Sequence, residues 1–121
     1  MDNDLKAKIR AELFRCAVAG VFPTYTEFFN RIHPGKQMGN FPYQTHFNEI
    51  AREERDLGYP DITFLVKGVN GFPNQIDFRD ARKGPDNDQL RSLRAGTDRL
   101  IELYCPPQTP NPYGQFPFEQ D

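Results

Sequence analysis

The sequence predicts an α+β fold of the winged-helix type: a three-helix bundle with a β-hairpin wing, followed by a C-terminal helix and a Pro-rich tail. Two observations lead to this prediction. Up to Leu57 the apolar residues recur at helical spacing in three segments, and beyond it the chain changes to a β-branched, apolar run bounded by turn residues. Three short helices bury a common apolar corner, and a hairpin can cover its open side.

The first two helices are defined by periodicity and by their end signals. The first is expected from about residue 4 to Ala19, where apolar side chains recur at spacings of three and four, and Gly20 ends it. The second is expected from about Thr24 to Ile32, because Thr24 and Glu27 stand at the spacing of a capping box.

A third helix and two strands follow. Asn40 is expected to cap the third helix, with Pro42 in its first turn, and Gly58 to end it. Ile62–Lys67 is β-branched and apolar, which predicts a strand buried on at least one face. An Asn-Gly pair then favours a tight hairpin turn, and Gln75–Phe78 alternates polar and apolar residues as a second strand does.

A fourth helix and a tail complete the chain. The helix is expected over Asn87–Cys105, on an apolar stripe of Leu90, Leu93, Thr97, Leu100 and Tyr104. A homodimer through residues 88–104 and packing of this stripe onto the first helix of the same chain are both open. Residues 1–105 are expected to form one domain. Residues 106–121 contain five prolines and are expected to be an extended or disordered tail, with three aromatic anchors at Tyr113, Phe116 and Phe118.

Composition limits the function more than it identifies it. The 121 residues carry 15 basic and 17 acidic side chains, a net charge of −2, so contact with a nucleic acid requires a local basic patch. The chain has no apolar run of 18 residues and its N-terminus does not resemble a secretory signal, so we expect no membrane span and a cytoplasmic location. Cys16 and Cys105 have no metal-type spacing and are expected to be reduced thiols.

Three segments resemble a known type of domain. They are residues 25–29 (YTEFF), 58–66 (GYPDITFLV) and 71–73 (GFP), together with Ile50. In a small winged-helix-like domain of prokaryotes and phages, a tyrosine-led second helix precedes a third helix ending in Gly-Leu-Pro, a strand similar to Leu-Thr-Ala-Leu-Val-Val and a Thr-Gly-Leu-Pro-Gly turn. The resemblance covers about residues 21–74, and the sequence departs from it at Asn70 and Asn74. It implies a winged-helix fold and a phage or mobile-element protein, alone or beside a restriction-type nuclease domain.

Double-stranded DNA is the partner that this fold favours. The start of the third helix offers amide and hydroxyl groups that can contact adenine or phosphate, and an arginine follows on the same helix. Basic and polar groups of the loop, the wing and the segment after it can contact neighbouring phosphates, although salt-bridged surface side chains explain them about as well. The predicted DNA-binding residues are Lys36, Gln44, Thr45, Asn48, Arg52, Lys67, Asn70, Arg79, Arg82 and Lys83.

A protein partner is the alternative. In the second half of the third helix, two arginines, Arg52 and Arg55, are outnumbered by the acidic residues Glu49, Glu53, Glu54 and Asp56. This half is expected to repel a phosphate backbone. It suits a protein-binding module, for example an inhibitor of a host defence enzyme that presents charge to a basic groove. An ordinary solvated helix face is consistent with the same residues.

Catalysis is not expected. Asp61, followed by Asp77 or Asp80, has the layout of a divalent-metal nuclease, but arginine stands where that mechanism needs a lysine, and an arginine keeps its proton. His33 and His46 have no partners at ligand spacing. We therefore predict a binding protein without a catalytic residue, a metal or a cofactor.

Overall fold

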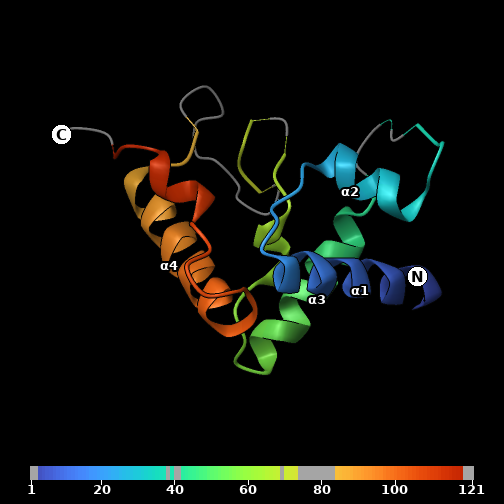
Figure 1. The fold of residues 1–121 in the computed structure, drawn as a ribbon, viewed down its shortest axis with the longest axis horizontal. Helices are drawn as coiled ribbons and strands as arrows, with labels where there is room; N and C mark the ends of the chain where they lie inside the picture. Colours follow the sequence, from blue (N-terminus) through green and yellow to red (C-terminus); the bar gives the residue numbers. More distant parts are fainter. Residues whose placement is uncertain (1–2, 38, 40–41, 69, 74–83, 119–121) are drawn as a thin grey trace.

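The regular elements of the protein are helices. The computed structural model describes residues 3–37, 39, 42–68, 70–73 and 84–118, and no β-strand is present among them. The elements in chain order are α1 (Asn3–Ala19), α2 (Tyr25–Ile32), α3 (Gln44–Asp56), the 3-10 helix η1 (Ile62–Leu65), α4 (Asn87–Tyr104) and the 3-10 helix η2 (Pro112–Gln115) (Figure 1). No helix in this part of the chain is both long enough and apolar enough to cross a lipid bilayer.

The winged-helix prediction is therefore wrong, and the fold is all-α. The run taken for the first strand forms η1, because the Asp61 side chain accepts a hydrogen bond from the Thr63 amide (2.9 Å) and starts a tight helical turn. The run is apolar because η1 is almost entirely buried. A short apolar run does not distinguish a buried strand from a buried helical turn. The predicted second strand, Gln75–Phe78, lies outside the described residues.

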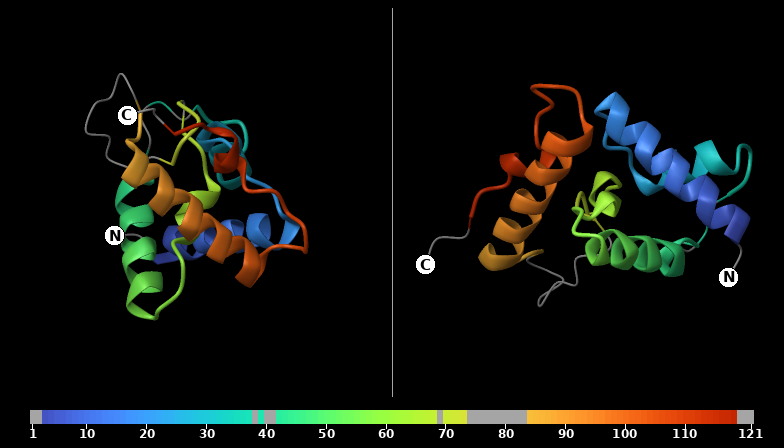
Figure 2. Two further views of the ribbon diagram at one scale, coloured as in Figure 1. Left: turned by 90° about the vertical axis from the view of Figure 1, so that its left-hand side faces the viewer. Right: turned by 90° about the horizontal axis from the view of Figure 1, so that it is seen from below.

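The short helix η1 occupies the centre of the molecule. It contacts α1, α3 and α4, and Figures 1 and 2 show it between α4 on one side and the α1–α3 group on the other. The larger apolar cluster contains Ile62 and Leu65 of η1 together with buried side chains of α1, α2 and α3. A smaller cluster lies between α4, η2 and Phe72. An isolated parallel bridge joins Thr24, just before α2, to Lys67, two residues after η1.

The ends of α1 and α2 confirm their sequence signals. Gly20 adopts a φ of +70°, its amide donates to Ala17 O, and the Val21 amide donates to Cys16 O, both at 3.0 Å. This arrangement is a Schellman motif, which requires the left-handed conformation that glycine adopts without strain. At the start of α2, the Glu27 amide donates to Thr24 Oγ1 and the Thr24 amide donates to the Glu27 carboxylate, so the predicted capping box is present.

The start of α3 differs from the prediction. The helix begins at Gln44, with Tyr43 as its N-cap and no side-chain cap, whereas Asn40 was the expected cap. Tyr43 is only 1% exposed and packs against Phe28, Phe29 and Phe47. We attribute the later start to this aromatic packing, because burying large rings contributes more free energy than one capping hydrogen bond. Burial raises the pKa of the Tyr43 phenol to about 12.

The fourth helix agrees with the sequence to within one residue. Its apolar stripe is buried within the same chain, against α1, η1 and η2. The stripe is therefore not a surface on which a second copy could pack. Gly96 lies where α4 approaches η1, because a Cβ atom at this position would be 3.1 Å from a ring carbon of Phe64. A glycine inside a helix lowers its stability, but here the absence of a side chain at Gly96 allows α4 to pack closely against Phe64 of η1.

The segment after α4 is folded back onto that helix through residue 118. Tyr113 is fully buried, and its hydroxyl donates to the carbonyl of Phe64 at 2.6 Å. Arg94 donates from Nε to the Tyr113 carbonyl (3.0 Å), and its guanidinium lies 4.4 Å from the ring centre of Phe118. One aromatic side chain in the smaller cluster and one arginine thus fix a proline-rich segment that periodicity alone does not place.

Candidate nucleic-acid interface

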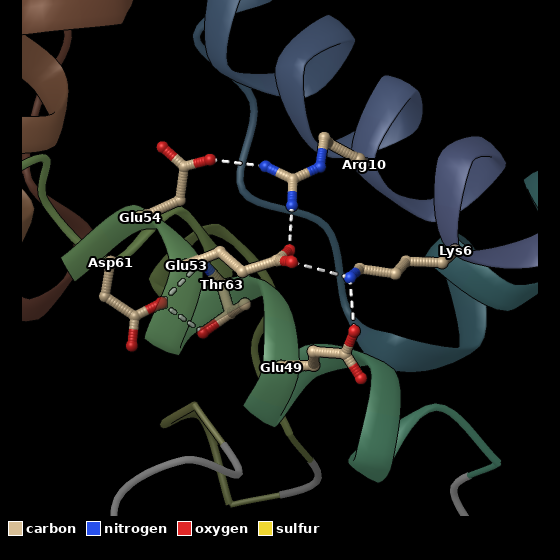
Figure 3. Close-up of polar contacts among 7 residues, drawn as sticks. All are labelled: Lys6, Arg10, Glu49, Glu53, Glu54, Asp61 and Thr63. Atoms are coloured by element: carbon tan, nitrogen blue, oxygen red, sulfur yellow. Dashed lines mark hydrogen bonds and ion pairs between the residues drawn. The ribbon is translucent and has the colours of Figure 1, made fainter. Parts of the chain in front are cut away.

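One side of α3 is joined to α1 by ion pairs. Two cations of α1, Lys6 and Arg10, contact three carboxylates of α3 (Figure 3). The Lys6 ammonium bridges Glu49 and Glu53, with a distance of 2.8 Å to Glu53 Oε2. The Arg10 guanidinium bridges Glu53 and Glu54, with 2.5 Å between Nη1 and Glu54 Oε1. We call these five residues the α1–α3 ion cluster.

The α1–α3 ion cluster is partly shielded from water. The side chain of Glu54 is only 5% exposed, and that of Lys6 is 15% exposed. The hydrogen bonds that Lys6 donates to the carboxylates of Glu49 and Glu53 raise the pKa of Lys6, and the bond to Glu53 lowers the pKa of that carboxylate. Hydrogen-bonded ion pairs of this kind fix the position of α3 relative to α1. Most of the charge of the cluster is neutralised by pairing within the fold.

The other side of α3 faces solvent and has a different chemistry. Thr45, Asn48, Arg52 and Arg55 are exposed and follow one another at intervals of three and four residues, so they lie on one face of the helix. Gln44 adjoins them, and its amide donates to Asn48 Oδ1 at 2.9 Å. These five residues form what we call the outer face of α3. Figure 2 shows α3 along an edge of the molecule.

The charge on the outer face is weakly positive. It carries Arg52 and Arg55, and Asp56 shares its C-terminal end as an exposed acid. Among the described residues, no carboxylate lies within ion-pair distance of either arginine. The face therefore presents two arginines, one hydroxyl and two amides, which are groups that contact phosphates and base edges.

The structure brings together four of the predicted DNA-binding residues and separates the others. Gln44, Thr45, Asn48 and Arg52 share the outer face. Lys36 is exposed in the loop after α2. Lys67 is held at the start of α2 by backbone hydrogen bonds to Pro23 and Tyr25. Asn70 is exposed in a turn, where its side chain accepts from the Phe72 amide at 3.0 Å. Arg79, Arg82 and Lys83 lie outside the described residues.

The sequence prediction omitted Arg55 from the site. Its position, three residues after Arg52 and seven after Asn48, places it on the same face, so the spacing alone could have included it. The sequence prediction treats the second half of the helix, with its glutamates and both arginines, as one surface that repels phosphate. The α1–α3 ion cluster shows that these glutamates lie on a different side of the helix.

The groups considered for metal or nucleophilic chemistry have structural surroundings. Asp61 starts η1 and accepts from the Thr63 hydroxyl and amide, and burial raises its pKa. Asp77 and Asp80 lie outside the described residues. The Cys16 thiol is buried, and burial raises its pKa to about 11, which keeps it protonated at neutral pH. In the part of the chain that the structure describes, no three metal-ligating side chains come together.

Comparison with models of protein families, with curated proteins and with solved structures finds no match to this chain.

Proposed function

We propose that this protein binds double-stranded DNA through the outer face of α3. The observation that carries the proposal is the division of charge on that helix. The glutamates that would repel a phosphate backbone are held by Lys6 and Arg10, and the outer face retains both arginines of the helix. The acidic character of α3 in the sequence thus lies mostly on the side that faces α1, where the glutamates are paired with Lys6 and Arg10.

The shape and chemistry of the outer face suit a major groove. An α-helix fits the major groove of B-form DNA, whereas the narrow major groove of A-form RNA excludes it. The amides of Gln44 and Asn48 lie near the start of α3, where they can contact adenine edges, and Thr45 can contact phosphate. Arg52 and Arg55, one and two turns further along, can neutralise phosphates.

The alternative, a protein-binding module, was based on the acidic residues in the second half of α3. That reading required a free acidic surface on α3, and three of the four acids are engaged with α1. Asp56 is the one acid of this half that remains exposed at the outer face. The phage or mobile-element setting and the absence of catalysis stay predictions.

The test is binding to a random duplex, measured by fluorescence anisotropy at about 50 and 200 mM salt. We expect measurable binding at the lower salt concentration and a steep loss at the higher one, because each phosphate contact contributes about 0.9 to the salt slope. The double substitution Arg52→Ala/Arg55→Ala should lower affinity about tenfold or more and reduce the slope by about 2. A duplex RNA of the same length should bind more weakly.

The matched control is Lys8→Ala/Arg91→Ala, which removes the same charge from exposed positions on α1 and α4. This variant should bind DNA within about twofold of the parent protein, because nonspecific affinity depends on local contacts more than on net charge. An equal loss in both double variants would contradict an interface on α3. Absence of binding by the parent protein at low salt would overturn the proposal as a whole.

A further inference from the structure

Exposed apolar side chains gather where the chain leaves α3 and passes the C-terminal half of α4. Leu57 is 69% exposed, Tyr59 47% and Leu103 51%, and together they account for half of the large exposed hydrophobic residues in the described part of the chain. Tyr59 and Leu103 line a shallow groove of about 410 Å³ with Gly58, Pro60, Arg99 and Glu102. We call Tyr59 and Leu103, the two exposed apolar side chains of this groove, the apolar patch. Neighbouring exposed apolar groups mark an interaction site more often than isolated ones do.

The charged groups beside the apolar patch are balanced. Arg99 and Glu102 lie one turn apart on α4, and Arg99 donates to the Gly58 carbonyl at 3.3 Å. No ion pair joins Glu102 to another described residue. The rim therefore presents one positive and one negative charge. A strongly acidic or basic partner would place a like charge opposite one of them, which opposes binding.

We propose that the apolar patch binds a second copy of this chain in a two-fold symmetric dimer. In such an interface the same surface meets itself, so each group must be complementary to another group of the same patch. If the two α4 helices cross antiparallel, Arg99 of each copy faces Glu102 of the other, while Leu103 and Tyr59 pack at the centre. The rim charges satisfy this requirement, and they give the second copy an advantage over a partner of one charge sign.

The dimer has a consequence for DNA, and this consequence alone rests on the proposed function. Tyr59 lies three residues beyond the end of α3, so the symmetry axis lies near the C-terminal ends of the two α3 helices. The dimer would present two outer faces, and a duplex with two inverted half-sites would be bound more tightly than one with a single half-site.

The test is sedimentation velocity of the pure full-length protein from about 1 to 500 µM, without DNA. Because the apolar patch is small, we expect a weak dimer, with a dissociation constant in the micromolar range. Arg99→Glu and Glu102→Arg should each raise that constant at least tenfold, since each places like charges opposite one another. The double variant Arg99→Glu/Glu102→Arg should return to within about threefold of the parent, because the exchanged charges pair again.

Circular dichroism of each variant checks that the fold is retained, which is expected because the altered side chains are exposed. A parent protein that sediments as a monomer over the whole range would overturn the proposal. A double variant no better than its single variants would also overturn it. Because no DNA is present, a failure of the DNA-binding proposal leaves these results unchanged.

Discussion

The two sides of α3 use charge in opposite ways. On the side that faces α1, three glutamates are held by Lys6 and Arg10, and the side chain of Glu54 is nearly inaccessible. On the outer face, Arg52 and Arg55 are exposed to solvent. The sum of charges along the helix is negative, but the surface that a partner meets is weakly positive. The net charge of a helix therefore says little about its interactions until each charged group is assigned to a side.

The largest effect is expected from breaking the ion cluster at Arg10. Arg10→Met leaves the buried carboxylate of Glu54 without its cation, and we expect a loss of about 3 kcal/mol in the free energy of unfolding. The control, Arg52→Met on the outer face, should change stability by less than about 0.5 kcal/mol. Urea unfolding at neutral pH measures both. Equal and small effects would mean that the two sides of α3 do not differ as described.

A smaller effect is expected at Lys6, and it depends on pH. The hydrogen bond from Lys6 lowers the pKa of Glu53 below its ordinary value of 4.5. The stabilisation is thus present above that value and is lost as the pH falls through the lowered pKa. Lys6→Met should cost about 1 kcal/mol at pH 7 and progressively less in acid, as thermal unfolding at pH 7 and pH 3 would show.

The control for this experiment is Lys8→Met, which removes an exposed lysine from the same helix. It should leave both the stability at pH 7 and its change with pH close to those of the parent protein. A constant difference between the Lys6 variant and the parent at both pH values would contradict the assignment of the acid-labile stabilisation to Lys6 and Glu53.

The helix boundaries that depend on local signals could be predicted from the sequence. The capping box of α2 and the glycine after α1 are local, and both are present in the structure. The predictions for the start of α3 and for residues 62–65 were wrong because long-range packing determines both features. Tyr43 starts α3 through aromatic neighbours from α2, and η1 is apolar because three helices surround it. Neither of these packing contacts produces a periodic pattern of apolar residues that could be recognised in the sequence.

Only part of the candidate site could be predicted from the sequence. The polar residues at the start of α3 were found, but the glutamates beside them were read as part of one surface. A signal was present: Lys6 and Arg10 are four residues apart beside the apolar stripe of α1, and Glu49 and Glu53 have the same spacing on α3. Oppositely charged positions that flank two apolar stripes pair when the stripes pack together. Using this signal requires knowing that α1 and α3 are neighbours, which the sequence does not show.

The most direct measurement is a backbone-amide NMR titration of the protein with a random DNA duplex at low salt. We predict that the largest chemical-shift changes occur at Thr45, Asn48, Arg52 and Arg55, with small changes at Lys6 and Arg10. The largest changes on α1, or no changes on α3 at saturating DNA, would contradict it.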